Sequence, residues 1–202
     1  FPLLDNIIEI ESIIKECNNK SVTELLLLEA QAKKIYFNSF DIILEKEKYH
    51  FIKRTKNPPQ NEINALLSYG YSLLYANYIS VIDRSRLYSQ ISFVHSLTKC
   101  SESLQFDLAD ILKPVLIDRL VLSLCRHKSL KDEYFDYKKD RCYLNKKGVK
   151  FFVEKYENYL LKTIKINNKY YSYRNLISRE VHLLSNYIAN ESNDYKPYIM
   201  KW

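Results

Sequence analysis

Residues 58–75 read PPQNEINALLSYGYSLLY, and this stretch decides the fold. The pair Pro58-Pro59 ends one helix and leads into the next, which the side chain of Asn61 can cap. Apolar residues then recur at helical spacing, with small residues between them. The apolar positions are Ile63, Leu66, Leu67 and Leu74, and the small ones are Ala65, Ser68, Gly70, Ser72 and Ala76. This pattern predicts a helix that neighbouring helices approach closely.

On both sides of this stretch, the same periodicity predicts further helices. They are expected to start at residue 3, Ser21, Ser103, Asn145 and Ser172. Glu24 follows Ser21 by three residues, as in a capping box. Pro114 is expected to kink or break its helix. Residues 91–94 are expected to be a short extended piece.

The chain of 202 residues contains only two glycines, Gly70 and Gly148. A β-rich fold normally needs more glycine for its hairpin turns, and a glycine-rich phosphate-binding loop needs glycines closer together. Hydrophobic residues make up 47% of the chain, enough for a sizeable core. We therefore expect an all-α fold, a compact helical bundle that forms one domain over residues 1–202.

The formal net charge of +7 suits a polyanionic partner, although a chain rich in Lys, Asn, Ile and Tyr also reflects an AT-rich genome. The four cysteines form no CxxC pair, which excludes a zinc ribbon and a thioredoxin-type motif. Isolated, reduced cysteines are typical of a cytoplasmic protein. No apolar run approaches the roughly 18 residues of a membrane-spanning helix, so no membrane is expected as a partner.

Four residues are candidates for chemistry. Glu29 shares the apolar face of its helix, where a carboxylate must be paired, protonated or metal-bound; alternatively, it pairs with Lys33 one turn later. His95 ends an apolar stretch, where a histidine is a ligand or, more commonly, a packing residue. Asp107 and Asp110 share one side of a helix near its start. Acids there also complement the helix dipole, which explains Asp107 better than Asp110.

These side chains together offer one imidazole and two or three carboxylates. Such a set suits Mn²⁺ or Mg²⁺ rather than a structural zinc ion, which prefers thiolates. The imidazole favours Mn²⁺. The sequence alone does not bring the three segments together in space.

Several stretches resemble the CRISPR-associated integrase family, whose members insert DNA fragments into CRISPR arrays. In chain order they are Glu24-Leu25-Leu26 with Glu29-Ala30 and Tyr36-Phe37, residues 58–75, Phe93-Val94-His95, residues 103–119, and Tyr143-Leu144-Asn145. The resemblance implies that Glu29, His95 and Asp110 hold the metal ion, and that Asp107 supports the site. It also implies a helical catalytic domain and phosphoryl transfer, in which a DNA 3′-hydroxyl attacks a phosphodiester at the repeat boundary. With water as the nucleophile, the same site would cleave DNA.

The resemblance implies three partners: double-stranded DNA, a second copy of the chain, and a small ferredoxin-like CRISPR-associated subunit. Basic residues flank the candidate ligands and are expected to hold phosphates, although each alone can be a solvated charge. They are Arg84, Arg86, Lys99 and Lys113. Two features depart from the family: residues 86–92 lack glycine, and the N-terminal β-rich domain is absent. We therefore expect a fragment, monomeric or weakly associated, or else an unusually short enzyme.

Two other functions fit the composition. A non-catalytic basic helical DNA-binding module predicts that Glu29, His95 and Asp110 lie apart in the fold. A structural or interaction domain predicts no salt-dependent DNA binding, because the positive charge would then be an accident of composition.

Overall fold

The computed structural model describes residues 2–94 and 102–200. Its α-helices are α1 (Pro2–Glu16), α2 (Val22–Leu44), α3 (Glu62–Ile82), α4 (Leu104–Lys113), α5 (Arg119–Arg126), α6 (Lys146–Leu160) and α7 (Tyr173–Ile188). A π-helical segment, η1 (Pro114–Asp118), joins α4 to α5, and a 3₁₀ turn, η2 (Asp132–Tyr134), precedes the first strand. The strands are β1 (Phe135–Lys138), β2 (Arg141–Leu144), β3 (Thr163–Ile166) and β4 (Lys169–Ser172).

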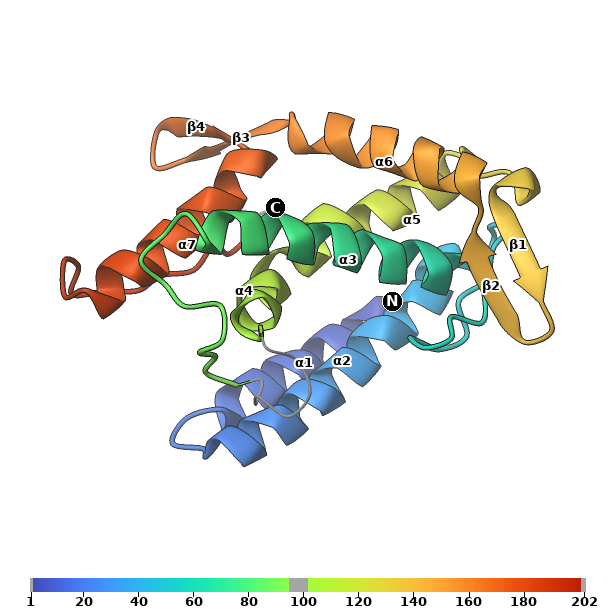
Figure 1. The fold of residues 1–202 in the computed structure, drawn as a ribbon. Coiled ribbons are helices and arrows are strands. Elements are labelled where there is room, and N and C mark those ends of the chain that lie inside the picture. The colour runs from blue at the N-terminus through green and yellow to red at the C-terminus, as the bar shows by residue number, and fades with distance from the viewer. Residues whose placement is uncertain (1, 95–101, 201–202) are drawn as a thin grey trace.

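The helices form a bundle around α3 (Figure 1). Helices α1 and α2 lie side by side along the lower edge, and α6 runs along the upper edge. Helices α4 and α5 lie between these two layers, and α7 packs against the C-terminal end of α3. Helix α3 supplies a large part of the core, because residues such as Ile63, Leu66, Leu74 and Tyr78 are fully buried.

The helix starts follow the predicted capping residues. The hydroxyl of Ser21 accepts a hydrogen bond from the N–H of Glu24, and the Glu24 carboxylate accepts one from the N–H of Ser21. The side chains of Asn61, Asn145 and Ser172 likewise accept hydrogen bonds from the first turns of α3, α6 and α7. These caps satisfy N–H groups that have no partner within the helix.

The expectation of an all-α fold is confirmed for the bundle but overlooks two antiparallel hairpins, β1–β2 and β3–β4. Their turns place Lys139, Asn167 and Asn168 at φ values of 50°, 47° and 65°. This left-handed region favours glycine, but asparagine tolerates it well because its short side chain can bond to the local backbone. The scarcity of glycine therefore did not exclude hairpins.

A close contact between α3 and η1 explains why the chain has glycine at position 70. A Cβ atom at Gly70 would lie 2.5 Å from Cγ2 of Ile117 and 3.2 Å from the ring of Phe152. Pro114 was expected to kink or break its helix. The backbone instead continues through it as a π-helical turn, in which the N–H of Arg119 donates to the carbonyl of Pro114.

The segment 91–94 was expected to be extended, and it forms no strand in the part of the chain that the structure describes. None of the helices among the described residues is long and apolar enough to cross a membrane.

Candidate functional site

Two of the predicted ligands, Glu29 and Asp110, lie on different helices and face the same ammonium group. Lys33 follows Glu29 by one turn of α2 and forms ion pairs with both Glu29 and, at 3.1 Å, Oδ2 of Asp110 on α4. The other oxygen of Asp110 accepts a hydrogen bond from Lys113. The sequence offered a pair between Glu29 and Lys33 as the alternative to metal binding, and this ion pair is present. Lys33 also binds the second carboxylate, that of Asp110.

The lysines keep Asp110 ionised. Burial of Asp110 favours the neutral acid, but Lys113 and Lys33 outweigh it and lower the pKa of the carboxyl group. Burial likewise opposes the charge on Lys33, while Asp110 and Glu29 raise the pKa of its ammonium group. The two carboxylates thus converge on a stable positive charge, which is the electrostatic environment that a cation needs.

Asp107 lies one turn before Asp110 on α4 and holds the backbone that leads to His95. Its Oδ2 accepts hydrogen bonds from the N–H groups of Phe93, at 2.6 Å, and Val94, at 3.0 Å. His95 itself lies outside the described residues. The chain is therefore tied to α4 directly before the predicted histidine ligand.

Behind the carboxylate pair lies a buried acid that the sequence did not single out. Asp118, at the end of η1, is 2% exposed, and its two oxygens accept hydrogen bonds from Tyr71 (2.6 Å) and Tyr36 (3.0 Å). Burial raises the pKa of Asp118 to about 6, although these phenols and the cations Arg54 and Lys113 oppose the shift. Asp118 lines the same cavity of about 250 Å³ as Glu29 and Asp110.

The π-helical turn accounts for the direction of Asp118. In a regular α-helix each residue turns the chain by about 100°, so a residue eight positions after Asp110 would face about 80° away from it. Each residue of a π-helix turns the chain by less, which brings Asp118 back towards the side of Asp110. One acid therefore connects α2, α3 and the end of η1 through two tyrosines.

A second cavity, of about 220 Å³, adjoins the carboxylate pair and is rich in cations. It shares Lys33, Lys113 and Tyr71 with the first cavity, and its lining comprises Lys33, Phe37, Arg54, Lys56, Ser68, Tyr71, Tyr75 and Lys113. Burial and the neighbouring charges of Lys33, Arg54 and Lys113 lower the pKa of Lys56. Burial also lowers the pKa of Arg54. Four cations held this close repel one another, so an anion in this cavity would be stabilised.

Aromatic rings hold two of these cations in place. Nζ of Lys113 lies 5.3 Å from the ring centre of Tyr71 and 4.9 Å from that of Tyr75, and the guanidinium of Arg54 lies 5.4 Å from the ring centre of Tyr71. Because the Tyr71 hydroxyl is bound to Asp118, the buried acid also fixes the ring beneath both cations.

The other predicted phosphate contacts lie elsewhere. Arg84 bonds to the carbonyl of Ser80, and Arg86 forms an ion pair with Glu191 just after α7. Neither arginine lines the two cavities. Lys99 lies outside the described residues. Of the four basic residues predicted to bind DNA, Lys113 is the one that the structure brings to the carboxylate pair.

Sequence reasoning missed Arg54, Lys56 and Asp118. Tyr71, which holds Asp118, lies within residues 58–75, where it follows Gly70. Among the described residues, no group of three or more His, Cys, Asp or Glu side chains is placed to hold a metal ion. Two of the three predicted ligands belong to this part of the chain.

The fold is that of solved Cas1 proteins and casposases. A Cas1 protein from Thermotoga maritima superimposes with a TM-score of 0.81 at 33% identity, covering 89% of this chain and 56% of the other. At 24% identity, a casposase bound to its integration product shares the fold, with a TM-score of 0.82 and coverage of 98% and 59%. A chain of a Cas6-RT-Cas1–Cas2 complex shares it at 21% identity, also with a TM-score of 0.82, covering 98% of this chain and 22% of the other.

The sequence comparisons define the family. The profile of CRISPR associated protein Cas1 matches residues 2–158. A CRISPR-associated endonuclease Cas1 from Thermodesulfovibrio yellowstonii is 34% identical over 202 residues, which are 99% of this chain and 60% of that protein. The Clostridium perfringens enzyme of the same name is 36% identical over 194 residues, 94% of this chain and 58% of that protein. The chain belongs to the Cas1 family and spans about three fifths of the length of these relatives.

Proposed function

We propose that the chain is a metal-dependent DNA endonuclease and integrase that joins 3′-hydroxyl ends of DNA to phosphodiesters by transesterification. The observation that carries the proposal is the convergence of Glu29 and Asp110, from α2 and α4, on one cation beside a basic cavity. A carboxylate pair and adjacent cations together suit a phosphodiester, which is itself anionic and needs charge stabilised at the reacting phosphorus.

Glu29, Asp110 and His95 would hold the metal, Mn²⁺ or Mg²⁺. Their oxygen and nitrogen donors are the ligands that these ions prefer. The ammonium of Lys33 lies between the two carboxylates, so a positive charge is already stabilised where the ion would bind. When bound, a divalent ion polarises the phosphate and stabilises the charge that develops in the transition state.

The remaining groups would position the DNA. Lys113 would contact a phosphate oxygen while the ring of Tyr71 keeps its ammonium in place. Arg54 and Lys56 would receive a neighbouring phosphate in the basic cavity, which relieves the repulsion among these cations. Asp107 would orient the segment that carries His95, because it already binds the two preceding N–H groups.

Double-stranded DNA, a second copy of the chain and a small ferredoxin-like CRISPR-associated subunit are the proposed partners. The Cas1–Cas2 assembly that contains a chain of the same fold supports a Cas-protein partner. Joining both ends of a fragment needs two sites, which is why a second copy belongs to the proposal.

The test is an activity assay with matched variants of the chain. Wild-type protein is incubated with a DNA fragment that has free 3′-hydroxyl ends and a supercoiled plasmid, with Mn²⁺, Mg²⁺ or a chelator. Glu29→Gln and Asp110→Asn should each lower the rates of joining and nicking by more than roughly 100-fold. Removing a group that only supports a metal ligand typically lowers activity by roughly 10–100-fold. Asp41→Asn, which changes an exposed acid of α2, is the control and should remain active.

Three results would contradict the proposal: wild-type protein with no metal-dependent joining or nicking, activity that survives in the chelator, or activity retained by Glu29→Gln. Salt-dependent DNA binding without any product would favour the non-catalytic DNA-binding module instead.

A further inference from the structure

The positive charge of the chain is concentrated in one segment. Residues 135–174 contain eleven of the 31 Lys and Arg residues but only four of the 24 acids. The other 162 residues hold twenty of each sign, so this segment accounts for the whole net charge of +7. It comprises β1–β2, α6, β3–β4 and the start of α7, and is called the basic ridge below.

Most of these cations are exposed and lack a carboxylate partner. Ten of the eleven are exposed, namely Lys138, Lys139, Arg141, Lys146, Lys147, Lys150, Lys162, Lys165, Lys169 and Arg174. In the described part of the chain, only Lys147 and Arg174 among the eleven form ion pairs, with Glu133 and Glu157. Uncompensated charge of this kind is available to an external polyanion.

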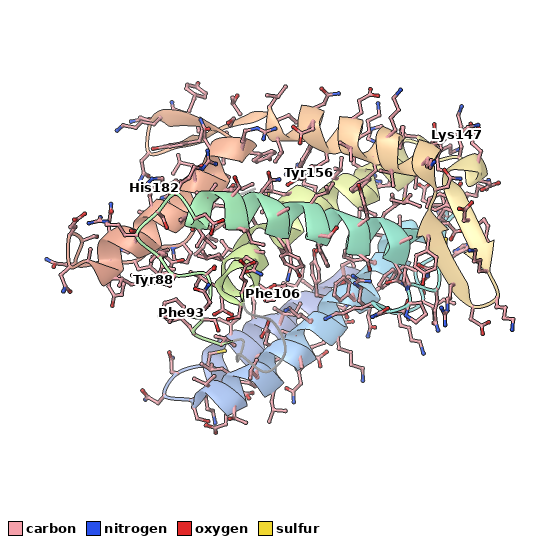
Figure 2. The ribbon with its side chains drawn as sticks, in the orientation of Figure 1. Tyr88, Phe93, Phe106, Lys147, Tyr156 and His182 are labelled. Atoms are coloured by element: carbon pink, nitrogen blue, oxygen red, sulfur yellow. The ribbon has the colours of Figure 1, made fainter. Side chains whose placement is uncertain are left out.

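Local structure directs these side chains outward. In the β3–β4 hairpin Ile164 and Ile166 pack against the core, so the alternating position, Lys165, faces solvent opposite Tyr170. Helix α6 is similarly two-sided. Lys147 projects from its outer end, whereas Tyr156 points inward, where its hydroxyl accepts a hydrogen bond from the side-chain amide of Asn77 on α3 (Figure 2). The ridge is therefore the solvated face of elements whose opposite face is core.

Each hairpin also exposes tyrosine among its cations. Tyr170 is 73% exposed, and Nζ of Lys165 lies 6.0 Å from the centre of its ring. Tyr137 on the β1–β2 hairpin is 55% exposed, and its hydroxyl donates a hydrogen bond to the carboxylate of Glu62. Lysines and tyrosines at the surface are common donors to DNA phosphate oxygens.

The two hairpins stand at opposite ends of α6 (Figure 1). The 15 residues of α6 span about 22 Å, and the hairpins extend beyond both ends. One turn of B-form DNA measures about 34–36 Å, so two cationic ends on one face can meet the same strand one turn apart. Between the two hairpins, the exposed face of α6 carries the acids Glu154 and Glu157. These acids repel phosphates, so the DNA contacts are expected at the two ends of the ridge.

We propose that the basic ridge binds the phosphate backbone of duplex DNA at two places about one helical turn apart, outside the candidate functional site. In Figure 1, α2 lies along the opposite edge of the molecule from α6, so the ridge and the carboxylate pair are separate surfaces. The choice of DNA over another polyanion rests on the proposed function, whereas the existence of the surface does not.

The test measures binding, not catalysis. Fluorescence anisotropy is recorded with labelled duplexes of about 20 and about 8 base pairs, without divalent ions, in the Glu29→Gln background. One triple variant carries Lys138→Gln, Arg141→Gln and Lys150→Gln, and the other carries Lys162→Gln, Lys165→Gln and Lys169→Gln. The matched control removes three exposed charges at the α1–α2 edge of the molecule, by Lys15→Gln, Lys20→Gln and Lys34→Gln. Circular dichroism melting establishes that all the variants fold.

On the longer duplex, each ridge variant should weaken binding at least tenfold near 0.1 M salt. Its log–log salt slope should become shallower by about 2–3, since each lost phosphate contact removes about 0.9. The control should stay close to wild type, because charges more than about 10 Å from the DNA are screened at that salt. The wild-type slope should be roughly halved on the short duplex, which cannot reach both ends of the ridge.

Equal weakening by the control would overturn the proposal, because net charge alone would then explain binding. Wild-type affinity in both ridge variants would also overturn it. Equal salt slopes on the two duplexes would refute the two-place contact. Since the Glu29→Gln protein is used throughout, these outcomes are independent of whether the proposed chemistry is correct.

Discussion

Replacing the buried acid, Asp118→Asn, is expected to change how the free energy of unfolding depends on pH. Burial raises the pKa of Asp118 from 3.8 to about 6 in the folded protein, so the folded state holds more protons than the unfolded state between these values. The contribution of Asp118 to the stability of the wild-type protein should therefore fall as pH rises through this window. Each pKa unit is worth about 1.4 kcal/mol, so the shift is worth about 3 kcal/mol in full. Because pH 4 already lies just above the unfolded pKa, about 2.5 kcal/mol of this is lost between pH 4 and pH 7.

Asparagine does not titrate and lacks this cost. Its amide oxygen can accept from one tyrosine only, so the variant loses a hydrogen bond at every pH, worth about 1–3 kcal/mol. The diagnostic quantity is the change with pH. In urea unfolding series, the stability of Asp118→Asn minus that of wild type should rise by about 2.5 kcal/mol from pH 4 to pH 7.

The exposed Asp132 provides a control of opposite sign. Hydrogen bonds from Lys48 and Tyr49 lower its pKa, so wild-type protein gains this stability above the unfolded pKa and loses it as pH falls. For Asp132→Asn, the stability of the variant minus that of wild type should therefore fall as pH rises towards the unfolded pKa of 3.8, and should stay nearly level from there to pH 7. If the wild-type and Asp118→Asn curves ran parallel from pH 4 to 7, Asp118 would not be the strained, ionised group described here.

Three further substitutions test other parts of the structure. Gly70→Ala should lower stability by about 1–2 kcal/mol. An approach of 2.5 Å to Ile117 puts the clash at the upper end of the cost of overpacking, about 2–3 kcal/mol, and helix propensity returns about 1. Unfolding experiments should show rescue by Ile117→Ala, and unchanged or raised stability in the single variant would contradict the packing argument. Asp107→Ala should slow DNA joining by roughly 10–100-fold while the protein remains folded, as for a group that orients a ligand; wild-type rates would remove Asp107 from the site. Lys33→Met should tighten Mn²⁺ binding in calorimetry, because it removes the ammonium that competes for the carboxylate of Asp110; weaker binding would mean that Lys33 helps to hold the ion instead.

The helix starts could be predicted because their causes are local. A capping side chain and the N–H groups that it satisfies lie within three residues of each other, as at Ser21 and Asn61. The hairpins could not be predicted from the scarcity of glycine, because Asn167 and Asn168 adopt the left-handed conformation themselves. Asparagine as well as glycine tolerates the left-handed region, so a low count of glycines does not exclude hairpin turns.

In the candidate site, too, some residues could be predicted from the sequence and others could not. Glu29 and Asp110 could be picked out because each is an acid on a helical face that also carries apolar residues. Arg54 and Lys56 could not, since the loop before α3 places them beside α2 and α4 only through tertiary packing. Asp118 depends on a π-helical turn, and no spacing rule for a regular helix brings it to the side of Asp110.

The central claim is that Glu29 and Asp110 hold a divalent ion, and anomalous diffraction from crystals of the chain soaked in Mn²⁺ tests it most directly. The predicted result is a manganese peak about 2.0–2.5 Å from a carboxylate oxygen of each residue, with Lys33 displaced from between them and a nitrogen of His95 completing the set. A map at saturating Mn²⁺ in which Lys33 still joins the two carboxylates, with no peak beside them, would contradict the claim.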